Sequence, residues 1–184
     1  MGSIEPYETA SGRRYRVRYR RPDHRHGAKR GFRTKREAER YLISVESQIQ
    51  TGDFIDPAGS RVTVGELAPD WLDVKRMKLK PSSYKLLDDA WRVYVEPRWG
   101  SVPLGAVTHS DVQKWITQVS AGTARTVRRY HARTAEVAKR PKSATVVIRV
   151  YGVLAAVLDV AVRDRRIARN PARGVDLPRK RRKR

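Results

Sequence analysis

The sequence predicts an α+β protein: a small three-stranded antiparallel sheet with one helix, followed by an all-α bundle of four to five helices. Apolar and basic residues alternate with period 2 over residues 13–21, as in a strand with one buried face. Later stretches repeat apolar residues at helical spacing. Residues 52–62 hold Gly, Pro and Ser without any period, which indicates a linker. We therefore expect domains at 1–52 and 63–176, a linker at 53–62 and a basic connecting segment at 177–184.

The strand at residues 13–21 has an apolar face and a basic face. Its apolar face holds Tyr15, Val17 and Tyr19. The side chains between them point to the opposite side and are all arginines, namely Arg14, Arg16, Arg18 and Arg20. Ser11-Gly12 is a turn signal, so residues 3–9 can form a partner strand. In a third strand around residues 29–33 we expect Phe32 on the apolar face, and Lys29 and Arg33 on the basic one. No acidic run lies near enough in the sequence to neutralise the arginines.

A helix follows the third strand. Thr34 and Glu37 have the spacing of a capping box, and Gly52 is a plausible stop. One apolar stripe runs along the helix and consists of Ala38, Tyr41, Leu42, Val45 and Ile49. We expect this stripe to cover the apolar face of the sheet and to leave the arginine side bare.

Four further helices are expected after residue 62. A second capping box, Thr63 with Glu66, begins the first of them. Pro81 suits the first turn of the second, which should end at Pro97. The third, capped by Thr108, should bury Val112, Trp115, Ile116 and Val119, and the fourth should span residues 143–164. Their apolar stripes predict a compact core rather than a cofactor site.

Charge constrains the partner more strongly than the fold. The chain has 184 residues, 41 Lys and Arg against 19 Asp and Glu, and a formal net charge of +22. Residues 1–50 carry a net charge of +7, residues 51–120 carry 0 and residues 121–184 carry +15. Two separated basic blocks favour two contacts along one long polyanion, and nucleic acid is the obvious candidate. The strand aromatics share the apolar face with Val17, which favours double-stranded DNA over RNA. The segment at 121–142 is long for a bundle connection, and we expect Arg125, Arg128 and Arg129 in it to contact phosphate.

Other classes of site and location find little support. The chain has no cysteine, and His24 with His26 lacks a third metal ligand, so no metal or cofactor is expected. No signal peptide and no apolar run near 18 residues is evident, so we expect a soluble, intracellular chain with no membrane and no small-molecule ligand. No residue set suggests catalysis. The main alternative is an RNA-binding or ribosome-associated basic protein, and another is an assembly module with an incidental basic tail.

Several stretches together resemble one family. "GFRTKREAERYL", after a basic hairpin, resembles the AP2-like arm-binding domain of phage integrases. "TVGELAPDWL", "KPSSYKLLDDAWRVYVEPRWGSVPLGAVTHSDVQKWI" and "VLAAVLDVAVRDRRIARNPARGVDLPR" resemble, in this order, the SAM-like core-binding domain of tyrosine recombinases. The resemblance covers nearly the whole chain, and the order of the stretches makes it specific.

The resemblance implies that the first domain binds arm-type DNA sites and the second grips the core site during site-specific integration. Carried onto this chain, it points to two groups of core-site residues: Lys80, Ser82, Ser83, Tyr84 and Lys85, and Lys142, Ser143, Thr145 and Arg149. The family's catalytic domain, with its tyrosine nucleophile, would follow the basic segment at 177–184, so we expect no catalysis from this chain alone. The implied partners are other integrase protomers and a DNA-bending host factor, in the bacterial cytoplasm beside the nucleoid.

Overall fold

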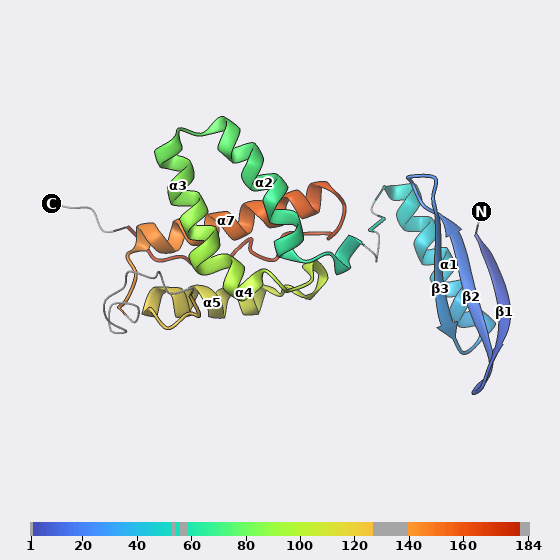
Figure 1. The fold of residues 1–184 in the computed structure, drawn as a ribbon. Coiled ribbons are helices and arrows are strands. Elements are labelled where there is room, and N and C mark those ends of the chain that lie inside the picture. The colour runs from blue at the N-terminus through green and yellow to red at the C-terminus, as the bar shows by residue number, and fades with distance from the viewer. Residues whose placement is uncertain (1, 53, 56–58, 127–139, 181–184) are drawn as a thin grey trace. The chain divides into compact units, whose positions relative to one another are not determined.

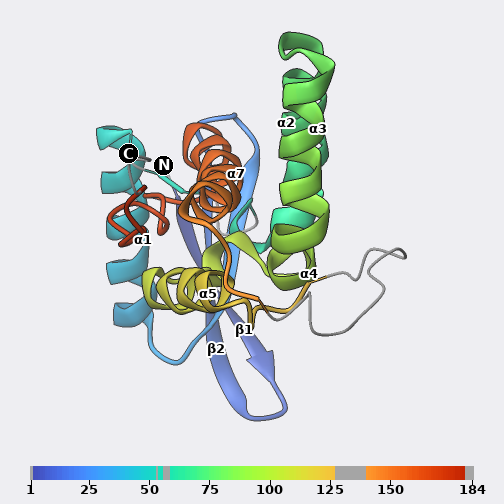
Figure 2. The same ribbon diagram turned by 90° about the vertical axis from the view of Figure 1, so that its left-hand side faces the viewer.

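The computed structural model describes residues 2–52, 54–55, 59–126 and 140–180 of the chain (Figure 1). It divides into two compact units, Met1–Ile55 and Asp56–Arg184. The first unit is a three-stranded sheet with one helix, and the second consists of helices (Figure 2). This is the α+β class that the sequence predicts.

The sheet unit consists of β1 (Ser3–Thr9), β2 (Gly12–Arg20), β3 (His26–Phe32) and α1 (Lys35–Thr51). The strands are antiparallel in the order β1-β2-β3. A two-residue turn joins β1 to β2, with Thr9 paired to Gly12 and Glu5 paired to Arg16. Gly12 has a φ of 99°, which a residue with a side chain adopts only at a cost in strain.

The core of this unit lies between α1 and one face of the sheet. Val17 and Tyr19 of β2 are buried against Ala38 and Val45 of α1. Phe54, which the sequence places in the linker, is also buried and packs edge-on against Tyr19 at 5.8 Å. The predicted stripe of α1 therefore faces the predicted apolar side of β2.

The amino end of α1 departs slightly from a capping box. Thr34 Oγ1 accepts a hydrogen bond from the Glu37 N–H at 3.2 Å, as expected. The Glu37 carboxylate reaches one residue further back and accepts from the Arg33 N–H at 3.0 Å. Gly52, with a φ of 76°, ends the helix as predicted.

A β-bulge changes which side chains of β3 face the helix. Tyr15 pairs with Phe32 and Val17 pairs with Lys29, so β3 has one residue more than β2 between these pairs. Gly31, with a φ of 98°, lies in this extra step. Because the bulge breaks the two-residue alternation, Lys29 and Phe32 lie on the same side of the sheet.

The helical unit is organised around its last helix. Its helices are α2 (Val64–Lys78), α3 (Pro81–Ala90), α4 (Glu96–Trp99), α5 (His109–Ala121) and α7 (Ala144–Arg163). Short 3-10 turns lie at Gly59–Arg61 and Leu104–Ala106. α7 packs against α2, α3 and α5 (Figure 1). The four predicted core residues of α5 are buried in one cluster with eight residues of α7, which confirms the predicted stripe of α5.

The second predicted helix continues past the proline that was expected to end it. A π-helical turn at Trp91–Val95 joins α3 to α4, and the Glu96 N–H bonds to the Trp91 carbonyl. Pro97 has no N–H and cannot continue an ordinary ladder, but the wider turn immediately before it shifts the hydrogen bonding by one residue. The helical path therefore ends at Trp99, which is buried in an edge-to-face pair with Trp115 at 5.8 Å.

The chain after α7 is fastened to the bundle by side chains. Gln113 Nε2 donates to the Asp176 carbonyl at 3.3 Å, and Gln113 Oε1 accepts from the Asp176 N–H at 2.8 Å. Asn170 donates to Asp159 at 2.7 Å, and the Tyr151 hydroxyl donates to the Ala172 carbonyl at 2.9 Å. Residues 170–176 thus return alongside the helices (Figure 1).

α7 is a long and largely apolar helix. Among the residues that the structure describes, Ala144–Arg163 is the one helix that is long and apolar enough to cross a membrane, by length and composition alone. Arg149 and Asp159 interrupt the run in the sequence. Eight residues of α7 are buried in the bundle core, and the core helix of a soluble protein passes the same test.

Candidate nucleic-acid interface

The four predicted arginines of β2 lie on the face of the sheet that α1 does not cover. They alternate with Tyr15, Val17 and Tyr19, which pack toward α1. Residues paired directly across an antiparallel sheet share a face, so the strand register adds Ser3, Glu5 and Tyr7 from β1 and His26 and Ala28 from β3. We call this surface the arginine face: Arg14, Arg16, Arg18 and Arg20 with these five neighbours.

One carboxylate lies within the arginine face. Glu5 Oε2 accepts a hydrogen bond from Arg16 Nη2, and Glu5 Oε1 lies 3.5 Å from Arg18 Nη1. The hydrogen bond from Arg16, and then the charges of the two guanidinium groups, hold the pKa of the Glu5 carboxyl below its ordinary value. The sequence pattern did not predict Glu5 on this face, because Glu5 is a single acid on the partner strand rather than part of an acidic run.

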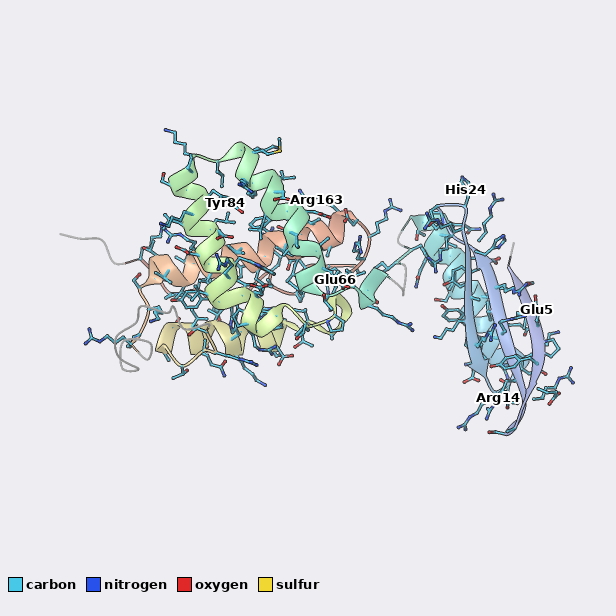
Figure 3. All side chains as sticks on the ribbon, in the orientation of Figure 1. Glu5, Arg14, His24, Glu66, Tyr84 and Arg163 are labelled. Atoms are coloured by element: carbon cyan, nitrogen blue, oxygen red, sulfur yellow. The ribbon has the colours of Figure 1, made fainter. Side chains whose placement is uncertain are left out.

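The outer two arginines of the face differ from the inner two. Within the described part of the chain, no acid lies within 4.0 Å of Arg14 or Arg20. Figure 3 labels Arg14 on β2 and Glu5 on β1. Arg14 is instead paired across the sheet with Tyr7. Both outer guanidinium groups are therefore available to a polyanion.

Lys29 does not join the arginine face, which corrects the expectation for β3. Its ammonium lies 4.3 Å from the centre of the Tyr41 ring on α1 and 5.6 Å from that of Phe32. The bulge at Gly31 turns it toward the helix, where it makes a cation–π contact. Arg33 follows β3 and is exposed.

The first predicted group of the helical unit lies at the start of α3. Lys80, Ser82, Ser83 and Lys85 are exposed, and Tyr84 is half-buried. Figure 3 labels Tyr84 on α3. Lys80 is the N-cap residue and provides no side-chain cap, and Pro81 follows it. The first-turn amide of Ser82 is therefore free to meet an anion.

The second predicted group lies at the start of α7. The Lys142 N–H donates to the Ser120 carbonyl at 3.0 Å, which fastens this end of α7 to α5. Ser143 and Thr145 are exposed, and Ser143 makes no side-chain cap. Arg149, one turn further on, lines a hollow of about 310 Å³ between α3 and α7. The two groups thus lie on neighbouring helices.

The basic insert is described only in part. Arg125 is exposed. Arg128 and Arg129 lie outside the described residues, so their predicted phosphate contacts stay predictions. Within the described ranges, no group of three or more His, Asp or Glu side chains could hold a metal ion.

The turn between α2 and α3 exposes apolar side chains that the sequence stripes did not single out. α2 and α3 form a hairpin whose turn extends away from α7 in both views (Figures 1 and 2). Met77 is 89% exposed near this turn, and Val74, Leu79 and Leu86 are exposed on the same hairpin. Lys75, Arg76, Lys78 and Lys80 surround them in sequence.

Comparison with known proteins identifies both units. Residues 9–49 match the family model of the Arm DNA-binding domain, a range that begins at the last residue of β1 and includes β2, β3 and α1 as far as Ile49. Residues 63–120 match that of the phage integrase N-terminal SAM-like domain, from the cap of α2 to the last turn of α5. No curated protein and no solved structure matches the chain.

Proposed function

From the premise that the chain carries the amino-terminal, DNA-binding region of a phage-type integrase, we propose that its two units bind two different segments of double-stranded DNA. The sheet unit binds arm-type attachment sites through the arginine face. The helical unit binds the core-type site through the amino ends of α3 and α7.

The arginine face is the observation that carries this proposal. It presents four guanidinium groups on one side of a three-stranded sheet, while α1 covers the opposite side. A β-ribbon fits the major groove of B-DNA, and arginine forks match both phosphates and guanine edges. One internal carboxylate leaves the four arginines with a local net charge of +3, which still favours a polyanion.

The helical unit supports a second contact. α3 and α7 are neighbours, and each begins without a side-chain cap. Lys80 is the N-cap residue of α3 and Lys85 lies in its second turn, while Lys142 directly precedes the N-cap residue of α7. Amino ends of helices bind phosphate through free N–H groups, and nearby ammonium groups add attraction.

The wider setting follows from the same premise. We propose that the chain serves a tyrosine recombinase that integrates a phage genome in the bacterial cytoplasm, together with other integrase protomers and a DNA-bending host factor. In that role, its two units hold arm and core segments while strand exchange takes place in a catalytic domain.

One observation favours the RNA-binding alternative. Tyr7 of β1 is paired with Arg14 and so belongs to the arginine face, where a base could stack on it. Sheet-type RNA readers use two or three such aromatic residues, but Tyr15, Tyr19 and Phe32 pack toward α1. Duplex DNA is therefore the better fit.

A titration of the full chain against labelled duplex DNA at several salt concentrations tests the proposal. Arg14→Ala with Arg20→Ala removes two unpaired charges from the arginine face. The matched control, Arg36→Ala with Arg40→Ala, removes two charges from α1 in the same unit. We expect only the first pair to weaken binding and to reduce the slope of log K against log salt by up to about 2.

Equal binding by both double variants would contradict docking through the arginine face. Tighter binding of single-stranded RNA than of duplex DNA would favour the alternative. Footprints on attachment DNA test the two-unit part, because two independent readers should protect two segments of different sequence.

A further inference from the structure

Glu5 is the one acidic side chain on the arginine face among the described residues. A surface that only neutralises phosphates gains nothing from a carboxylate, which repels the backbone of DNA. The register places Glu5 directly opposite Arg16, as the middle one of the three residue pairs that β1 and β2 contribute to this face. Its position therefore needs a reason beyond charge.

Glu5 divides the four arginines into two kinds. Arg16 and Arg18 both contact its carboxylate, and the side chain of Arg16 is only 22% exposed. Arg14 and Arg20 have no such acid among the described residues. A long side chain without a partner samples many rotamers, whereas one held by a carboxylate presents its remaining donors in a narrow range of directions.

We propose that Glu5 is a positioning residue that holds Arg16 and Arg18 for direct reading of guanines in the major groove, while Arg14 and Arg20 contact phosphates. This inference rests on the proposed docking of the arginine face on duplex DNA. It goes beyond that proposal by naming the kind of DNA sequence that the arginine face selects.

The spacing of the two held arginines sets the spacing of the bases. Residues two apart in a strand are separated by about 6.7 Å. Successive base pairs of B-DNA are about 3.4 Å apart, so Arg16 and Arg18 match guanines up to two base steps apart. A shared carboxylate draws the two guanidinium groups together, which keeps both within one short stretch of the groove.

Bidentate contact is what makes orientation matter. Arginine reads guanine by donating to O6 and N7 together, which requires the plane of the fork to match the base edge. A phosphate accepts a donor from many directions. Loss of Glu5 should therefore reduce discrimination between sequences more than it reduces affinity.

A purely structural role makes a different prediction. Exposed ion pairs between neighbouring strands stabilise a sheet only slightly, so Glu5 could merely help β1 pair with β2. In that case its loss would lower stability a little and leave the preferred DNA sequence unchanged. The preferred sequence is thus the readout that separates the two roles.

The experiment selects from a library of duplexes with a randomised central segment, using the full chain and the variant Glu5→Gln. Glu8→Gln is the matched control, since it removes the same charge from the same strand but at a position of opposite parity. Arg16→Lys with Arg18→Lys is a second variant, which keeps the charge and removes the bidentate fork.

We expect the unmodified chain and Glu8→Gln to enrich one motif with guanines at most two steps apart. Glu5→Gln should bind random duplex at least as tightly, with a salt slope steeper by up to about 0.9. Its preference at the guanine positions should fall roughly 5- to 150-fold. The double lysine variant should lose the same preference at nearly unchanged affinity for random duplex.

Two results would overturn the inference, and a third would overturn the proposed function on which it rests. An unchanged motif in both test variants would show that Glu5 does not position the readers. Salt-dependent duplex binding with no enriched motif would leave the proposed function standing and remove the reading of guanines. Failure of the unmodified chain to bind any duplex would remove the proposed function itself.

Discussion

Leu154→Ala probes the centre of the helical unit. Leu154 lies in the middle of α7 and is 0% exposed, within the cluster that joins α7 to the other helices. Truncation removes three buried carbon atoms and leaves a cavity that a helix packed on several sides cannot easily close. We expect a loss of about 2–5 kcal/mol in the free energy of unfolding.

Tryptophan fluorescence reports this change selectively. All four tryptophans of the chain, Trp71, Trp91, Trp99 and Trp115, lie in the helical unit, and the sheet unit has none. Urea unfolding followed by tryptophan emission therefore measures the helical unit alone. For a unit of this size, the expected loss lowers the urea midpoint by about 1–2 M.

Leu86→Ala is the control, because it makes the same chemical change at a position that is 47% exposed on α3. It should lower the free energy of unfolding by less than about 1 kcal/mol, since the Leu86 side chain buries little apolar surface. A midpoint unchanged in Leu154→Ala, or an equal fall in both variants, would refute the burial on which the estimate depends.

Three further predictions concern single side chains. Gly152→Ala in α7 should stabilise the helical unit by about 0.5–1 kcal/mol in the same urea assay, because an ideal Cβ there meets no atom within 4 Å; a fall in stability would contradict this. Burial, followed by the proximity of Tyr19, raises the pKa of Tyr41 to about 12, so absorbance titration should show one late phenol that Tyr41→Phe removes. Between pH 10 and 12 this phenol should make the sheet unit less stable as pH rises, since only the unfolded state releases the proton. The Thr63 N–H and hydroxyl lower the pKa of Glu66. The native chain should therefore be more stable to unfolding than Glu66→Gln above the ordinary pKa of 4.5, and this difference in stability should disappear as pH falls below 4.5. A difference in stability that does not depend on pH would contradict this prediction.

The helices could be predicted from sequence because their signals are local. Thr63 Oγ1 accepts from the Glu66 N–H at 3.2 Å, and the Glu66 carboxylate accepts from the Thr63 N–H at 2.7 Å, so the predicted capping box is complete. Thr108 and Asp111 form a similar contact at the start of α5. Each of these contacts spans three residues, so composition within one turn is enough to find it. The continuation through Pro97 escaped prediction because a π-helical turn has no comparable local signature.

The third strand shows where local pattern fails. Alternation alone places Lys29 and Phe32 on opposite faces, since they are three residues apart. The bulge at Gly31 adds one residue and brings both to the helix side, where Lys29 meets the Tyr41 ring. Gly31 is compatible with a bulge, but a glycine alone does not fix where the extra residue falls, because a bulge is a property of the pairing with β2.

Glu5 could have been found from the sequence by one further step. A two-residue turn at residues 10–11 pairs Thr9 with Gly12 and, counting outward, Glu5 with Arg16. A turn longer by one residue would instead set Glu5 opposite Val17, an apolar residue of β2. Register therefore decides whether the face is an unbroken row of cations or a row with a carboxylate at its centre.

That difference has a consequence for how the face can act. An unbroken row of cations attracts any polyanion, and its affinity depends on charge alone. With Glu5 holding Arg16 and Arg18, and with Lys29 turned away to α1, the Lys and Arg side chains of the arginine face are all arginines, and two of them have a defined direction. Lysine in the same positions would keep the charge but could not present a planar fork. A preference for sequence over mere duplex charge is therefore what this arrangement adds, and substitution of arginine by lysine should remove that preference first.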